Sequence, residues 1–126
     1  MRLKDKVAII TGAGSGIGAE SARRFVEEGA RVLIADMQDD KGQAIADELG
    51  DAAVFLHVDV SQEQHVEAAV AEAVATWGKL DIIFNNAGFG GALGSIETTT
   101  VDDFDLTFDV LVKGVFLGIK RAIPAM

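Results

Sequence analysis

The chain has no cysteine and no tyrosine, and only one proline and one tryptophan among its 126 residues. The absence of cysteine excludes a disulfide framework and a metal site built on thiolates, and it is typical of proteins from a reducing compartment. Positive charge is also scarce, because the chain has only 11 Lys and Arg residues but 20 Asp and Glu residues, which gives a formal net charge of −9. A nucleic-acid partner is therefore not expected, since binding to a phosphate backbone needs clustered basic residues.

Long apolar runs are missing as well. No uncharged stretch approaches the ~20 residues that span a bilayer, and the N-terminus lacks the apolar segment of a signal peptide. We therefore expect no membrane partner and a cytoplasmic location. Within these limits, a hydrophobic content of 49% over 126 residues is enough for a single domain, 1–126, with a buried core.

Short apolar runs alternate four times with segments of helical periodicity. This alternation is typical of βα units, whose right-handed connections place helices on both faces of a parallel sheet. Ser61 is a candidate N-cap, and Gly29 and Gly78 are candidate helix stops. The expected strands are 6–11, 31–36, 53–58 and 80–85, and the expected helices are 17–28, 40–49, 62–76 and 101–122.

The most informative segment is Thr11–Gly18, with the sequence TGAGSGIG. It follows the apolar run 7–10 and opens a helical pattern, so it connects a strand to a helix. Unpaired N–H groups at a helix N-terminus bind anions such as a pyrophosphate, and glycine lets the phosphates approach the main chain. Asp36 ends the next apolar run, 20 residues beyond Gly16, where a dinucleotide fold places a carboxylate for the ribose. The pattern predicts a nicotinamide dinucleotide site.

Three motifs together carry a more specific resemblance. The spacing T-G-x-x-x-G-x-G fits Thr11, Gly12, Gly16 and Gly18, the pair Asp59-Val60 follows the third apolar run, and Asn85-Asn86-Ala87-Gly88 follows the fourth. With these motifs in order along the whole chain, the sequence resembles the short-chain dehydrogenase/reductase family. The expected fold is α/β of the Rossmann type, a doubly wound parallel sheet with strand order 3-2-1-4, helices on both faces and a nucleotide at the carboxyl ends of the strands.

Each glycine of the turn has its own part in a dinucleotide fold. Gly12 makes the tight turn, Gly16 admits the pyrophosphate and Gly18 lets the helix pack on the strand. Ser15 and Ile17 are expected to supply backbone N–H groups near the phosphates. A glycine-rich turn that binds nothing is the structural alternative.

The expected cofactor is NAD. The Asp36 carboxylate would accept hydrogen bonds from the 2′- and 3′-hydroxyls of the adenosine ribose, and its charge would repel a 2′-phosphate. Family members that use NADP commonly carry a basic residue at the positions held here by Ser15 and Met37. The alternative is that Asp36 only terminates a strand.

Two further motifs are expected beside the cofactor. The resemblance implies that Asp59 accepts from the adenine amino group while the main chain of Val60 lines the same edge. A carboxylate after a strand is often only a helix cap, which is the alternative for Asp59. Asn86, Ala87 and Gly88 end the fourth strand and are expected next to the cofactor ribose.

The residues that perform the family's chemistry are missing. The resemblance implies a Tyr general acid/base in Y-x-x-x-K, a nearby Lys, a Ser that holds the substrate oxygen, and an Asn in the fourth helix. The chain has no Tyr, it stops at Met126, and the Asn position holds Leu111. We interpret it as the N-terminal, cofactor-binding part of a larger Rossmann domain whose catalytic C-terminal half is absent. Residues 1–126 alone are expected to contain no catalytic residue and to be inactive.

Apolar surface on the fourth βα unit indicates a partner. The run Leu80–Phe84 is typical of a parallel strand paired on both edges, yet in a 3-2-1-4 sheet one edge of this strand is bare. The helix 101–122 is apolar on two sides. One side is expected to pack on the sheet and the other on a partner, so a homo-oligomer that uses this helix is expected. The two apolar sides carry Phe104, Phe108, Leu111 and Val115, and Leu106, Val110 and Leu117.

The leading hypothesis is the NAD-binding portion of an oxidoreductase that transfers a hydride between NAD(H) and a small-molecule secondary alcohol or ketone. A non-catalytic nucleotide-binding or scaffold module that acts through a partner is the alternative. A methyltransferase that uses S-adenosylmethionine shares the glycine turn and the acid after the second strand, but the N-N-A-G segment is unexpected there. His57 and His65 are isolated on different elements, so neither a catalytic pair nor a metal site is expected.

Overall fold

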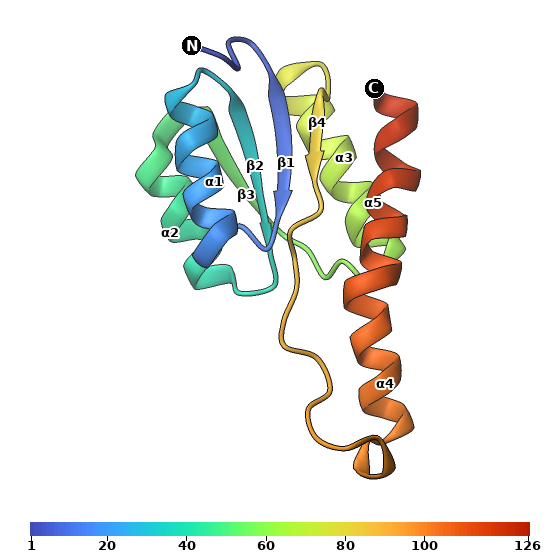
Figure 1. Ribbon diagram of the computed structural model, residues 1–126. Coiled ribbons are helices and arrows are strands. Elements are labelled where there is room, and N and C mark those ends of the chain that lie inside the picture. Colours follow the sequence, from blue (N-terminus) through green and yellow to red (C-terminus); the bar gives the residue numbers. More distant parts are fainter.

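A computed structural model describes all residues, 1–126, and shows a four-stranded parallel sheet in the order β3-β2-β1-β4 (Figure 1). The sheet order expected from the sequence is therefore confirmed. In register, Ile9 of β1 lies opposite Leu33 of β2 and Ile83 of β4. The strands are β1 (Val7–Thr11), β2 (Arg31–Asp36), β3 (Ala53–His57) and β4 (Ile82–Phe84).

Helices cover both faces of the sheet, with α1 and α2 on one side and α3 and α5 on the other (Figure 1). The π-turn Asp109–Lys113 joins α4 to α5, and short 3-10 turns occupy Gly50–Ala52, Ile96–Thr98 and Ile123–Ala125. None of the helices has the length and apolar character that crossing a membrane requires. The helices are α1 (Gly16–Glu27), α2 (Asp39–Leu49), α3 (Glu63–Trp77), α4 (Val101–Phe108) and α5 (Gly114–Ala122).

The core has two halves because successive strand side chains point to opposite faces. Val32 and Ile34 of β2 pack with α1 and α2, whereas Leu33 and Ala35 pack with α3. All four side chains are fully buried. Burial on both faces explains why the central strands are continuously apolar rather than alternating, and the arrangement confirms a doubly wound fold.

Of the two signals expected at the ends of α3, one is confirmed and the other is not. Gly78 ends α3 in the left-handed conformation, with φ +83, and its N–H donates to the carbonyl of Val74 at 2.7 Å. The N-cap expected at Ser61 is wrong, since α3 begins after Gln62. The N–H and hydroxyl of Ser61 instead donate to Oδ1 of Asp59, at 2.9 and 2.7 Å, because this carboxylate competes for them.

The segment 101–122 is helical throughout, as expected, but its middle, Asp109–Lys113, is a π-helical turn between α4 and α5. After the turn, α5 lies close against the strand ends, and glycines make this approach possible. A Cβ on Gly114 would lie 2.8 Å from Val60 Cγ2, and one on Gly118 would overlap the side-chain oxygen of Asn85. A π-helical turn adds one residue to a single turn of a helix. This change is too small for the apolar periodicity of 101–122 to predict it.

The edge strand β4 is held at its start by Asp81. Oδ2 of Asp81 accepts a hydrogen bond from the N–H of Val7 at 2.9 Å and pairs with Lys79 Nζ at 3.0 Å. The hydrogen bond from Val7, assisted by Lys79, holds the pKa of the Asp81 carboxyl below its ordinary value. The side chain therefore ties the beginnings of β1 and β4 together.

We expect Asp81→Asn to lower the free energy of unfolding at pH 7, with a difference from the native chain that shrinks in acid. Because the pKa of Asp81 is lower in the folded state, its contribution is complete above the unfolded value of about 3.9 and disappears as pH falls through the folded value. Urea unfolding at a series of pH values measures this difference. Asp51→Asn, at an exposed carboxylate without a side-chain hydrogen bond, is the matched control. An Asp81→Asn effect that is independent of pH would contradict the assignment.

Candidate functional site

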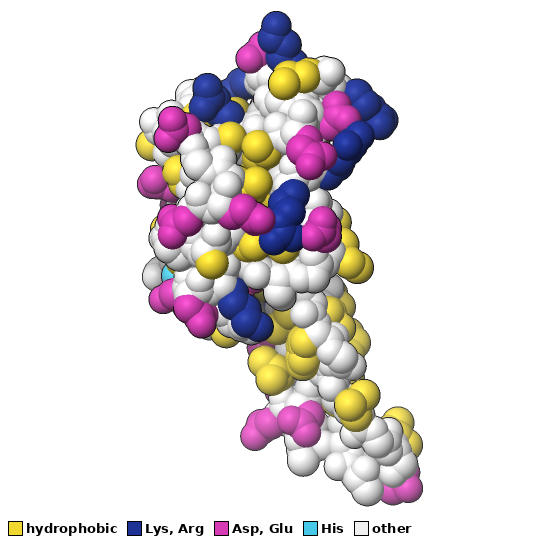
Figure 2. Space-filling model, turned by 90° about the vertical axis from the view of Figure 1, so that its left-hand side faces the viewer, with side chains coloured by type: hydrophobic (Ala, Val, Ile, Leu, Met, Phe, Trp, Pro, Cys, Tyr) yellow, Lys and Arg dark blue, Asp and Glu magenta, His cyan; other side chains and the backbone are white.

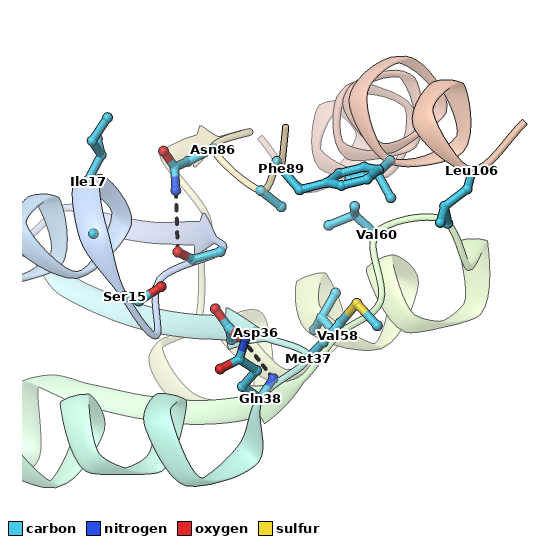
Figure 3. A pocket seen from close by; sticks show the side chains of 15 residues that line it. Ser15, Ile17, Asp36, Met37, Gln38, Val58, Val60, Asn86, Phe89 and Leu106 are labelled. Atoms are coloured by element: carbon cyan, nitrogen blue, oxygen red, sulfur yellow. Dashed lines mark hydrogen bonds between the residues drawn. The ribbon is translucent and has the colours of Figure 1, made fainter. Parts of the chain in front are cut away.

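A cleft of about 550 Å³ opens at the carboxyl ends of β1, β2 and β4 (Figure 3). Two of the expected site residues, Gly18 and Asp59, lie outside its lining, and the structure brings the others together. Gln38, Val58, Leu106 and Val110 are lining residues that the sequence did not indicate. The complete lining is Gly12, Ser15, Gly16, Ile17, Asp36, Met37, Gln38, Val58, Val60, Asn86, Ala87, Gly88, Phe89, Leu106 and Val110.

The floor of the cleft is the turn between β1 and α1. Gly16 has φ +55, a left-handed conformation that favours glycine, and a Cβ there would project into open space. The N–H groups of Gly16, Ile17 and Gly18 have no protein acceptor, and the first bonded N–H of α1 is that of Ala19. The first turn carries no acidic residue and the Ser15 side chain makes no cap bond. The turn therefore presents free donors and the positive end of α1 to an anion.

Thr11 and Asn86 hold this turn against the loop after β4. Asn86 Nδ2 donates to the carbonyl of Thr11 at 3.0 Å, and Thr11 Oγ1 accepts the N–H groups of Asn86 and Ala87, each at 3.0 Å. Thr11 is buried, with 4% of its surface exposed. Sequence reasoning included Thr11 in the glycine motif but did not assign it a role. Its hydroxyl, at the carboxyl end of β1, could have suggested these hydrogen bonds to a neighbouring loop.

Gly18 lies behind the turn, where α1 meets β1. A Cβ there would overlap the carbonyl oxygen of Gly12 and come 2.6 Å from Asn86 Nδ2. Its place accords with the packing task expected for it and explains why it does not line the cleft.

Alanine at Gly18 and at Gly16 should therefore have different effects. We expect Gly18→Ala to cost about 1–3 kcal/mol of stability through overpacking against backbone. Gly16→Ala should cost about 1 kcal/mol of backbone strain but should reduce anion binding, because its Cβ enters the cleft. Thermal unfolding and titration with NADH would compare the two variants. Equal destabilisation with equal binding would contradict this description of the turn.

Asp36 stands at the end of β2, at the other side of the cleft from Phe89 and Leu106 (Figure 3). Its Oδ2 accepts the N–H of Gly14 at 2.9 Å and its Oδ1 accepts the N–H of Gln38 at 2.8 Å. A carboxylate has about four acceptor positions, so both oxygens retain capacity for hydroxyl donors. Asp36 is the only charged residue in the lining, and no Lys or Arg is present there to bind the 2′-phosphate that distinguishes NADP from NAD.

Asp59 does not line the cleft, although its neighbours Val58 and Val60 do. Its Oδ1 accepts two bonds from Ser61, so the carboxylate is already partly engaged. The expectation that His57 and His65 are isolated is wrong, because their ring centroids lie 5.7 Å apart. The Nδ1 of His65 accepts the N–H of Asp59 at 3.0 Å, and His57 Nδ1 pairs with Asp39 at 2.6 Å. These histidines therefore support the loop after β3 from outside the cleft.

Leu111 lies in the π-turn, beside the loop after β4, and it does not line the cleft. A Cβ on Gly88 would lie 3.2 Å from Leu111 Cδ2, so the two residues pack together. The apolar end of the cleft is instead formed by Phe89, Leu106 and Val110. Sequence reasoning missed Leu106 and Val110 at the cleft, because only the tertiary packing of the helical segment 101–122 brings them to the strand ends.

Comparisons with known proteins agree with this geometry. The family described as short chain dehydrogenase matches residues 6–126. The chain is 51% identical to "Borneol dehydrogenase, mitochondrial" of Lavandula x intermedia over 99% of its length and 48% of that protein. It is 49% identical to "Tropinone reductase-like 2" of Erythroxylum coca over 99% of its length and 46% of that protein. The chain thus spans about half the length of the curated relatives it matches.

A solved structure gives the same result for the fold. The crystal structure of 3-ketoacyl-(acyl-carrier-protein) reductase from Brucella melitensis complexed with NADH superposes with a TM-score of 0.94 at 43% sequence identity. The match covers 98% of this chain and 51% of that one. The glycine turn, the sheet order and these relatives together establish that the chain belongs to the short-chain dehydrogenase family of oxidoreductases.

Proposed function

We propose that this chain is the NAD-binding portion of an oxidoreductase that transfers a hydride between NAD(H) and a secondary alcohol or ketone. The observation that carries the proposal is the cleft itself, in which free N–H groups at the start of α1 lie near a single carboxylate at the end of β2. This pairing of donors and acceptor suits a dinucleotide, whose pyrophosphate needs donors and whose ribose needs an acceptor. The solved relative, which binds NADH, supports the same ligand.

The open space above Gly16 supports the fit, because a Cβ there would obstruct the phosphates. In the proposal, Ile17 and Ser15 contact the pyrophosphate and Asp36 accepts the ribose hydroxyls. Val60 borders the adenine, and the neighbouring Asp59 is proposed to accept a hydrogen bond from the adenine amino group.

The nicotinamide half of the cofactor is proposed to lie along the loop after β4. Asn86, Ala87 and Gly88 form this wall of the cleft, and the absence of a side chain at Gly88 leaves room for the ribose. The nicotinamide ring supplies the hydride acceptor or donor when the cofactor is bound. The bonds that Thr11 makes to this loop keep its position fixed relative to the glycine turn.

The remaining parts of the reaction are proposed to lie in sequence beyond these 126 residues, since the relatives are about twice as long. Borneol is a secondary alcohol and tropinone is a ketone, and the names of these relatives support this substrate class for the complete enzyme. The apolar residues Phe89 and Leu106 at one end of the cleft suit an apolar substrate. A second copy of the chain against α4 and α5 is the proposed partner, and a cytoplasmic location is proposed with it.

NAD should bind at least about tenfold more tightly than NADP, which corresponds to about 1.4 kcal/mol. The reason is the Asp36 charge, which repels a 2′-phosphate, together with neutral Ser15 and Met37 where a phosphate would need a base. Asp36→Ala should narrow the difference between the two nucleotides. Isothermal calorimetry with both nucleotides measures the preference.

Asp40→Asn is the control for this preference, because it removes a nearby exposed carboxylate that does not line the cleft. It should leave the preference nearly unchanged. Tighter binding of NADP by the native chain would contradict the assignment of the cofactor. Binding of neither nucleotide would favour a module with another ligand.

A further inference from the structure

The Asp36 carboxylate joins two loops as well as facing the cleft. One oxygen accepts the N–H of Gly14, in the turn between β1 and α1, at 2.9 Å. The other accepts the N–H of Gln38, in the turn between β2 and α2, at 2.8 Å. In Figure 3 the carboxylate of Asp36 lies beside Ser15, and its bond to Gln38 is drawn. One side chain therefore fixes the spacing of two turns that border the cleft.

Packing at Gly14 shows how closely this loop approaches the carboxylate. A Cβ on Gly14 would lie 3.0 Å from Asp36 Cγ and Oδ2, and 3.2 Å from the backbone nitrogen of Gly42 in α2. Gly14 does not have a positive φ, so close contact rather than backbone conformation favours glycine here. Gly12 and Gly16 on either side do have positive φ, +65 and +55, in a segment with high conformational freedom. The carboxylate is thus the side-chain anchor at the middle of this segment.

We propose that Asp36 is a positioning residue for the pyrophosphate-binding turn, in addition to its part at the adenosine ribose. The N–H of Gly14 is held by the carboxylate, and the next free N–H groups, those of Ser15, Gly16 and Ile17, lie at the cleft as a result. The inference rests on the proposed function and deepens it. It implies that exchange of Asp36 weakens the pyrophosphate contacts of NAD and NADP alike, so cofactor preference cannot be changed at this residue without a loss of affinity for both.

Adenosine and ADP separate the two tasks, because both carry the same ribose but only ADP carries a pyrophosphate. We consider the ratio of their dissociation constants, adenosine over ADP, which reports the gain from the pyrophosphate. A loss of ribose contacts affects both ligands and cancels in the ratio, as does a smaller folded fraction. Removal of a negative charge by itself favours the anion and raises the ratio. If Asp36 positions the turn, the ratio falls instead.

The experiment measures both dissociation constants by calorimetry or NMR titration for the native chain, Asp36→Ala, Asp36→Asn and Asp40→Asn. We expect the ratio to fall by about tenfold in Asp36→Ala, the size of one hydrogen bond to a charged acceptor. The fall should be smaller in Asp36→Asn, which keeps one oxygen acceptor. Asp40→Asn removes the same charge from the first turn of α2 without contact to Gly14, and its ratio should stay level or rise.

An unchanged or higher ratio in Asp36→Ala, matching that of Asp40→Asn, would overturn the positioning task while leaving the dinucleotide site intact. Failure of the native chain to bind either ligand would overturn the proposed function together with this inference. A lower ratio in both Asp36→Ala and Asp40→Asn would also count against it, because the loss would then not depend on the contact between Asp36 and Gly14.

Discussion

Purified residues 1–126 should bind NADH but show no appreciable hydride transfer with any secondary alcohol or ketone. The chain has no Tyr, and Asp36 is the only titratable side chain that lines the cleft. Both oxygens of Asp36 already accept backbone N–H groups, and it stands across the cleft from the loop after β4. Without a positioned acid or base the rate should fall by about 10²–10⁴-fold relative to a complete enzyme.

NADH absorbance with a panel of secondary alcohols and ketones measures this activity. Titration of NADH in the same sample is the control, since it shows that an inactive protein still has an intact cleft. Turnover in the ordinary range of enzymes, about 1–10³ s⁻¹, would contradict the proposal that the catalytic acid and base lie outside residues 1–126.

The second large effect concerns association, because the isolated chain should not remain a stable monomer at micromolar concentration. Strand β4 pairs only with β1, so its outer edge is unpaired. Along α4 and α5, Phe104, Phe108 and Phe116 are 51%, 49% and 58% exposed, and the first two rings stack. The loop after β4 and α4 extend below the sheet (Figure 1), and Figure 2 shows hydrophobic side chains along this extension. Burial of roughly 400 Å² of apolar surface is worth about 10 kcal/mol, comparable with the net stability of a domain.

Size-exclusion chromatography with light scattering at low micromolar concentration tests this expectation. Phe104→Glu should shift the protein toward monomer, because it places a charge within the exposed aromatic pair. Ala71→Glu, at an exposed position of α3, adds the same charge elsewhere and should leave the distribution unchanged. A sharp monomer peak for the native chain, with a cooperative melt, would instead indicate that the four-stranded unit is self-sufficient.

The sheet and the glycine turn could be predicted because local chemistry determines them. Apolar runs such as 31–36 reflect burial on both faces, and the order of the strands was expected from the resemblance to a Rossmann fold. The position of Gly16 could be predicted because the turn and the start of the helix are adjacent in the sequence. Most of the residues that line the cleft are adjacent to strand ends, and for this reason they could be identified from the sequence.

Features that depend on packing between distant segments could not be predicted in this way. The helix 101–122 was expected, but its π-helical turn at Asp109–Lys113 was not, because one additional residue in a single turn is too small a signal in the apolar pattern. His57 and His65 meet only because the loop after β3 folds back, with Asp59 bonded to His65 and Ser61. The place of Leu106 at the cleft depends on where α4 docks, which periodicity does not specify.

A crystal structure of the protein with NADH would show whether NAD binds in the cleft between the glycine turn and Asp36. We expect the pyrophosphate over Gly16 and Ile17, with the adenosine ribose hydroxyls within hydrogen-bond distance of the Asp36 carboxylate. NADH bound at another surface, or bound in this cleft with the adenosine directed away from Asp36, would contradict this expectation.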